Sequence, residues 1–173
     1  MGYASRRLAV KDFTLAVLAA RGVGRARPSP RPVVSGSTGR MDIPQTTPRE
    51  AYATMQQDPT AVYLDVRTPG EFEAGHPAGA RNVAVVLFDP ATRRPTANAD
   101  FVDAVERLGP RTTKLLVGCQ AGGRSQRACE ILAASGFTDV TNVQGGFGGG
   151  QDDAGRLVPG WADCGLPVEK GPA

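Results

Sequence analysis

The sequence predicts an α/β domain in which a mostly parallel sheet carries helices on both faces. Three short aliphatic segments have the composition of buried strands, at residues 61–66, 81–87 and 114–118. Segments with helix-capping residues or helical spacing of apolar side chains alternate with these strands along the chain. Such an alternation is typical of parallel strands that are joined by helices.

The charge of the chain is unevenly distributed. Residues 1–40 contain seven Arg, one Lys and a single acid, Asp12, whereas the other 133 residues hold 12 basic and 16 acidic groups. The first part therefore carries a formal charge of +7 and the rest −4, so the basic character gives no reason to expect nucleic-acid binding by the domain. We expect a leader or linker over residues 1–40 and one domain over residues 41–170.

The leader allows three interpretations. Residues 5–11 resemble a twin-arginine export signal, the Arg-rich composition also resembles an organelle transit peptide, and Met41 is a plausible true start of translation. We expect a cytoplasmic protein, with the periplasm or an organelle as alternatives. No stretch approaches the roughly 20 apolar residues that span a bilayer, so no membrane partner is expected.

Two capping boxes place the first helices. Residues 47–50, Thr-Pro-Arg-Glu, supply an N-cap, a proline at the first helical position and the capping glutamate of a helix that runs to about Gln57. Residues 68–71 repeat the pattern for a single helical turn that ends at Gly75. The next elements are expected as strand 81–87, loop 88–97, helix 100–108, strand 114–118 and a helix from Arg124 to just before Gly136. A last short strand is expected within residues 137–143, followed by a glycine-rich turn 145–150 close to the Cys119 loop. After a polar loop over residues 151–159, we expect Trp161, Leu166 and Val168 to cover the end of the core.

Cys119 lies where the strand 114–118 passes into a helix. The adjacent Gly122 and Gly123 permit backbone dihedrals that turn successive N–H groups toward one point. The helix N-terminus and the Arg124 guanidinium add positive charge, which favours a thiolate and a bound anion. The stretch therefore predicts a nucleophilic Cys119 in an anion-binding loop made of Gln120, Ala121, Gly122, Gly123 and Arg124.

Three separated motifs resemble the rhodanese family of sulfurtransferases: LDVRTPGEFEAGHPAGARNV, CQAGGRS and VQGGF, within residues 43–169. The resemblance implies a three-layer sandwich around a sheet of about five strands. It also implies that Cys119 takes a sulfane sulfur from a small anionic donor such as thiosulfate, becomes a persulfide without any cofactor, and passes the sulfur to cyanide, a thiol or a sulfur-relay protein. The loop from Cys119 to Arg124 has six residues, whereas the related phosphatases and arsenate reductases carry one more, so phosphate ester chemistry is disfavoured.

Alternatives stay open for the activity and for several polar residues. A persulfide carrier or sensing module with little turnover of its own fits the same loop. Arg67 either forms an ion-pair network with Asp65 and Glu71 or faces the mouth of the loop and steers an anionic donor. Three cysteines and one histidine without a C-x-x-C motif argue against a zinc site. We expect Cys129 to pack in the core, Cys164 to be at most a resolving thiol, and His76 to be structural.

Overall fold

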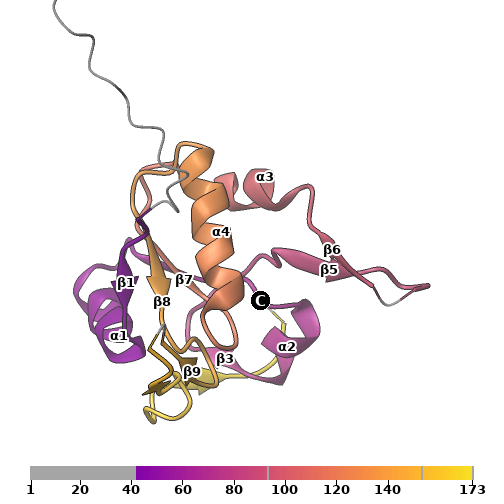
Figure 1. Ribbon diagram of the computed structural model, residues 1–173. Coiled ribbons are helices and arrows are strands. Elements are labelled where there is room, and N and C mark those ends of the chain that lie inside the picture. The colour runs from indigo at the N-terminus through magenta and orange to yellow at the C-terminus, as the bar shows by residue number, and fades with distance from the viewer. Residues whose placement is uncertain (1–41, 93, 153, 173) are drawn as a thin grey trace, which may run out of the picture. The chain divides into compact units, whose positions relative to one another are not determined.

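The computed structural model describes residues 42–92, 94–152 and 154–172 (Figure 1). Its central sheet has five strands in the order β1 (Gln45–Thr46), β8 (Val140–Val143), β7 (Leu115–Gly118), β2 (Val62–Asp65) and β4 (Arg81–Asn82). Every pairing in this sheet is parallel. The predicted α/β class and the mostly parallel sheet are confirmed. The predicted leader, residues 1–40, lies outside the described residues.

Helices cover both faces of the sheet in the described part of the chain: α1 (Pro48–Gln57), α2 (Pro69–Ala74), α3 (Phe101–Glu106) and α4 (Gly123–Ala134). Neighbouring residues of a strand point to opposite faces, so Tyr63 and Leu64 of β2 mark the two cores. The core around Tyr63 receives side chains from α1 and α2, and the core around Leu64 receives side chains from α3 and α4. In Figure 1, α4 lies in front of β7 and β8.

Both capping boxes are present, which explains why these two short helices begin where they do. The Thr47 hydroxyl accepts a hydrogen bond from the Glu50 amide, and the Glu50 carboxylate accepts one from the Thr47 amide. Thr68 and Glu71 make the same reciprocal pair. The register of β2 against β7 pairs Asp65 with Gly118, so the segments that follow the two strands emerge side by side at one edge of the sheet.

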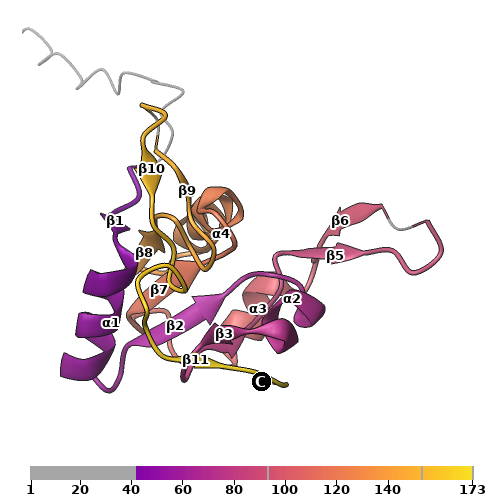
Figure 2. The same cartoon turned by 90° about the horizontal axis from the view of Figure 1, so that it is seen from below.

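The prediction of one continuous strand over residues 81–87 is wrong, because residues 81–82 and 86–87 belong to two different strands and residues 83–85 to none. Only Arg81 and Asn82 join the sheet, and the Asn82 side chain donates to the carbonyl oxygens of Asp65 and Arg67, at 2.9 Å each. The amides of Val83 and Val85 still donate to the carbonyl oxygens of Asp65 and Val66, at 3.1 and 3.2 Å, so the chain stays beside the end of β2 without continuing the strand. The expected loop then contains a hairpin, in which β5 (Val86–Phe88) pairs antiparallel with β6 (Pro95–Ala97). Figure 2 shows this hairpin extending away from the central sheet.

Four further short strands and the edge strand β1 were not expected from the sequence. β9 (Gly150–Gln151) pairs with β10 (Leu157–Val158), so the predicted polar loop is partly a hairpin, and β3 (His76–Pro77) pairs with β11 (Val168–Glu169). Trp161 is fully buried and Leu166 packs against the same core, as expected. Val168 does not cover the core, because it lies in the β11 edge strand with 43% of its surface exposed.

The described helices include none that is long and apolar enough to cross a membrane.

Tyr63 carries a buried hydroxyl that has no hydrogen-bond partner among the described residues. Burial raises the pKa of this phenol, and the neighbouring Asp65 carboxylate raises it further. A buried polar group without a partner costs free energy, so the Tyr63→Phe variant is expected to be as stable as the wild type or more stable by about 1 kcal/mol. Urea unfolding monitored by circular dichroism measures the difference. The matched change Tyr52→Phe, at a half-buried ring on α1, should leave the midpoint unchanged, and a clear loss of stability in Tyr63→Phe would show that the hydroxyl is satisfied.

Candidate functional site

Cys119 follows β7 directly and precedes α4, as the sequence predicted. Gly122 adopts a left-handed conformation, with φ of +100°, that residues with a side chain rarely take. In this conformation its N–H donates to the Cys119 Sγ at 3.1 Å. The Gly122 amide therefore contacts the sulfur, whereas the expected convergence of several loop amides stays a prediction. Cys119 as a whole is only 2% exposed.

Ser125 and Asn142 also belong to the site, although the sequence reasoning missed them. The Ser125 hydroxyl, in the first turn of α4, lies 3.4 Å from the Cys119 Sγ and 2.6 Å from the Asn142 Oδ1. It also lies 3.0 Å from the carbonyl oxygen of Gly122. Ser125 directly follows the last residue of the loop, and this position alone could have predicted a contact with the sulfur. The contact with Asn142 could not be predicted in this way, because it depends on the packing of β8 beside β7.

The glycine-rich segment after β8 supports the loop from behind. The amides of Phe147 and Gly148 donate to the carbonyl oxygens of Cys119 and Gln120, at 2.7 and 2.9 Å. Gly146, with φ of +54°, lies so close that a Cβ at this position would overlap the carbonyl oxygen of Cys119. The expectation that these glycines let the segment pass close to the loop is confirmed.

Arg67 is buried and its side chain connects the Cys119 loop to the segment that follows α2. Its guanidinium pairs with Asp65, donates to the carbonyl oxygen of Gly75 at 2.7 Å and to the Gln120 side chain at 3.3 Å. It also lies over the ring of Phe147, 4.4 Å from the centroid. Because Arg67 is only 2% exposed, its geometry fits a network residue that holds the Cys119 loop better than a residue that steers donors from solvent.

Glu71 does not join Asp65 and Arg67 in one network, which corrects that part of the sequence interpretation. It instead pairs with Arg124 through both carboxylate oxygens, at 2.7 and 2.8 Å. The Arg124 guanidinium, which we expected to act as a free cation at the anion-binding loop, thus has its charge neutralised in this structure. The pair also ties the start of α4 to α2.

Because of this ion pair, the stability of the fold is expected to depend on pH in the acid range. Hydrogen bonding from Arg124 holds the pKa of Glu71 at about 2, well below its usual value of 4.5. A lowered folded-state pKa contributes stability above pH 4.5 that is lost as the pH falls toward 2. The Glu71→Gln variant should therefore cost less than about 1 kcal/mol at neutral pH and show a flatter fall in stability across this window. Thermal unfolding between pH 6 and 2.5 measures it, and parallel profiles for the two proteins would contradict the assignment.

The remaining cysteines and the histidine lie outside the loop. Cys129 is fully buried in α4, and burial raises its pKa to about 12, in keeping with the expected packing role. Cys164 is half-buried in the C-terminal segment. His76 stacks on the ring of Phe72 at 3.6 Å, and its Nδ1 lies 2.8 Å from the carbonyl oxygen of the same residue. These contacts fit the expected structural role.

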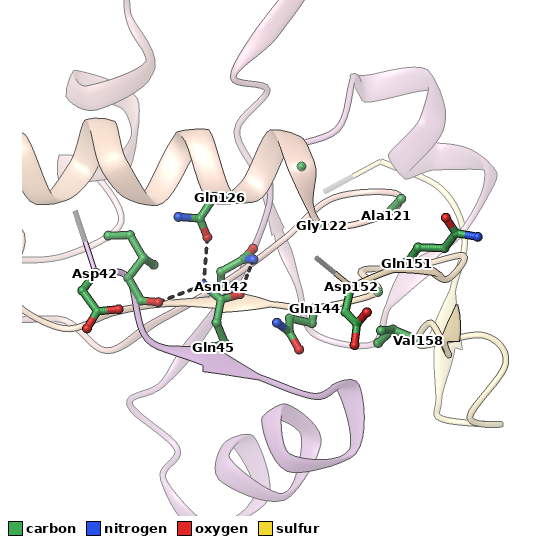
Figure 3. Close-up of a pocket in the computed structure, with 13 residues that line it drawn as sticks. Asp42, Gln45, Ala121, Gly122, Gln126, Asn142, Gln144, Gln151, Asp152 and Val158 are labelled. Carbon is green, nitrogen blue, oxygen red and sulfur yellow. Dashed lines mark hydrogen bonds between the residues drawn. The ribbon is translucent and has the colours of Figure 1, made fainter. Parts of the chain in front are cut away.

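A cleft of about 450 Å³ borders the Cys119 loop. It is bounded by the loop residues 121–123, by the edge strand β1 and by β8 (Figure 3). Side-chain amides gather on its wall, and Figure 3 shows Gln45, Gln126 and Asn142 meeting there. Within the described residues, no group of three or more His, Cys, Asp or Glu side chains could hold a metal ion.

Comparison with known proteins shows the family and the fold. The family model of the rhodanese-like domain matches residues 47–153. Thiosulfate sulfurtransferase 16 of Arabidopsis thaliana, a chloroplastic protein, is 37% identical over 107 residues, which cover 62% of this chain and 78% of that protein. Thiosulfate sulfurtransferase GlpE of Pseudomonas fluorescens is 34% identical over 58% of this chain and 77% of its own length.

Among solved structures, the crystal structure of Rv0390 from M. tuberculosis is 29% identical and superposes with a TM-score of 0.59, covering 73% of this chain and 97% of that one. The solution structure of the polysulfide-sulfur transferase homodimer of Wolinella succinogenes shares the fold, with a TM-score of 0.52 at 21% identity, over 76% of this chain and 81% of that one. The matched family model spans both the Cys119 loop and the glycine-rich segment behind it. The chain belongs to the family of rhodanese-like domains.

Proposed function

We propose that the protein is a sulfurtransferase in which Cys119 takes a sulfane sulfur from a small donor and passes it to a thiophilic acceptor. The observation that carries this proposal is the Gly122 N–H, which donates to the Cys119 Sγ at 3.1 Å where a buried strand passes into a helix. A donor aimed at the sulfur favours its anionic, nucleophilic form. The relatives named thiosulfate sulfurtransferase support the same reaction class.

The reaction divides into two displacements. In the first, the Cys119 thiolate attacks the outer sulfur of thiosulfate, a new S–S bond forms, and the old S–S bond breaks with its electron pair leaving on sulfite. In the second, cyanide or a thiolate attacks the outer sulfur of the persulfide, and the electron pair of the S–S bond returns to the Cys119 Sγ. The product is thiocyanate or a new persulfide, and no oxidant or reductant is consumed.

The charge on the Cys119 Sγ changes during this cycle, and the contacts around it act on that change. Sγ is anionic before loading and after unloading, whereas in the persulfide the negative charge lies on the outer sulfur. The Gly122 N–H and the Ser125 hydroxyl, at 3.1 and 3.4 Å, stabilise the anionic Sγ. They therefore support Sγ both as the nucleophile and as the leaving group of the second displacement.

The burial of Cys119 supports a small donor. With 2% of the residue exposed, the reacting atom must enter the loop, and thiosulfate presents a single terminal sulfur. The six-residue loop is also shorter than expected for phosphate ester chemistry.

A steady-state thiosulfate:cyanide assay tests the proposal. Double displacement predicts parallel lines in double-reciprocal plots when both substrates are varied, together with no turnover of an aryl phosphate under the same conditions. Absence of thiocyanate formation at millimolar substrate would contradict the small-donor reaction, and turnover of the aryl phosphate would favour the phosphatase alternative.

The second candidate function is a persulfide carrier that exchanges sulfur with a protein partner. It is favoured by the β5–β6 hairpin, which extends from the sheet and leaves Leu87 and Phe88 40% and 56% exposed. Exposed apolar side chains on an extended arm are typical of protein contacts. A stable mass increase of about 32 Da on Cys119, the mass of one sulfur, with negligible turnover of thiosulfate would favour the carrier.

A further inference from the structure

We propose that Asn142 is a positioning residue that directs the Ser125 hydroxyl and so sets the balance between the free Cys119 thiolate and its persulfide. The inference rests on the proposed function, because the persulfide is the second of the two states. Asn142 lies in β8 and is 4% exposed, and it reaches the sulfur only through Ser125. Its role is therefore to orient another group.

The orientation of the Asn142 side-chain amide is set by the backbone carbonyl of Ile43, which acts on it through the Gln45 side chain. The carbonyl oxygen of Ile43 can only accept, so the Gln45 side chain must turn its Nε2 toward it, at 2.8 Å. The Gln45 Oε1 then faces Asn142 and accepts from its Nδ2 at 2.7 Å. The Asn142 Oδ1 is left facing Ser125, at 2.6 Å, as an acceptor.

Three elements hold this arrangement in place. The parallel register pairs Gln45 of β1 with Asn142 of β8, and the backbone N–H of Asn142 donates to the carbonyl oxygen of Pro44 at 2.8 Å. From α4, the Gln126 Oε1 accepts a second hydrogen bond from the Gln45 Nε2 at 2.8 Å. Figure 3 shows Gln45, Gln126 and Asn142 in contact at the wall of the cleft. A flip of the Asn142 side-chain amide would break its bond to Gln45 and set its Oδ1 against the Gln45 Oε1, so that two acceptors would face each other.

Ser125 has one hydroxyl proton and three groups that can accept it. The Asn142 Oδ1 is at 2.6 Å, the Gly122 carbonyl at 3.0 Å and the Cys119 Sγ at 3.4 Å. While Sγ is neutral, as in the persulfide, the shorter bond to Asn142 is the better one. When Sγ is anionic, it becomes a stronger acceptor and competes for the proton. Asn142 therefore opposes stabilisation of the thiolate and favours the persulfide.

The test measures the equilibrium between the two states in the full-length protein. Wild type and variants are equilibrated at a pH high enough to ionise Cys119, at a thiosulfate-to-sulfite ratio that leaves the wild type half-loaded. The persulfide fraction at Cys119 is then read by peptide mass spectrometry. Ser125→Ala should raise the persulfide-to-thiolate ratio about tenfold, the equivalent of one hydrogen bond to a charged group. Ser135→Ala, a matched change at the other end of α4, should leave the ratio unchanged.

The two Asn142 variants should move the ratio in opposite directions. Asn142→Leu removes the shorter competing acceptor and should lower the ratio about threefold, whereas Asn142→Asp adds a stronger, anionic acceptor and should raise it. In a Ser125→Ala background, Asn142→Leu should leave the ratio unchanged, because the Ser125 hydroxyl proton that could turn to the sulfur is absent. A general loss of folding would instead shift the persulfide-to-thiolate ratio in the same direction in both variants, and that shift would not require the Ser125 hydroxyl.

Two results would overturn the inference while leaving the proposed function intact. One is a wild type that forms the persulfide while both Asn142 variants shift the ratio in the same direction or not at all. The other is an effect of Asn142→Leu that persists unchanged without the Ser125 hydroxyl. A wild type that forms no persulfide at Cys119 contradicts the proposed function itself and removes the inference with it.

Discussion

Cys119→Ser is expected to abolish thiocyanate formation from thiosulfate and cyanide, by at least about a thousandfold. Serine is nearly the same size as cysteine and can keep the contact with the Gly122 amide, so the fold and the loop should persist. Its hydroxyl is not ionised at neutral pH and cannot form the S–S bond that carries the transferred sulfur. The colorimetric thiocyanate assay measures the loss.

The control for this substitution is Cys164→Ser, which alters a half-buried cysteine outside the loop and should keep the wild-type rate. If Cys119→Ser retained a rate within tenfold of wild type, the sulfur would have to travel through another group. A loss of activity in Cys164→Ser as well would implicate Cys164 as a resolving thiol, a role that the sequence left open.

Gly146→Ala is expected to cause the largest loss of stability among single changes near the site. The new Cβ would overlap the carbonyl oxygen of Cys119, which is backbone and cannot rotate away, and φ of +54° is strained for any residue with a side chain. Overpacking and backbone strain together should cost about 3 kcal/mol or more. Because Phe147 must move as well, its hydrogen bond to Cys119 weakens and sulfur transfer should fall with stability.

Chemical denaturation of Gly146→Ala and Gly70→Ala provides the matched comparison. A Cβ at Gly70, in the first turn of α2, meets nothing within 4 Å and requires no left-handed backbone, so this variant should be at least as stable as wild type. Equal stability of the two variants would show that the glycine-rich segment can move away from the Cys119 loop at little cost.

The parts of the fold that the sequence predicted are those with local causes. The two capping boxes involve residues three apart, and the Cys119 loop lies between a strand and a helix that are adjacent in the chain. Both could be read from spacing alone. Gly136, with φ of +92° just after α4, was predictable for the same reason.

The parts that could not be predicted depend on tertiary neighbours. Glu71 and Arg124 are 53 residues apart, and only the packing of α2 against the start of α4 makes them a pair. The aliphatic run after Asn82 has the composition of one continuous strand, but residues 83–85 belong to no strand, and Val86 begins a hairpin whose second strand, β6, lies further along the chain. Asn142 approaches Ser125 only because β8 lies beside β7.

The central claim is that one sulfur atom, held by the Gly122 amide, accepts and releases another. Peptide mass spectrometry of the full-length protein, first after thiosulfate and then after cyanide, tests it most directly. We expect the Cys119 peptide to gain about 32 Da and then to lose it, while the Cys129 and Cys164 peptides stay unchanged. Turnover of thiosulfate without any gain of mass at Cys119, or with the gain at Cys164 instead, would contradict the account.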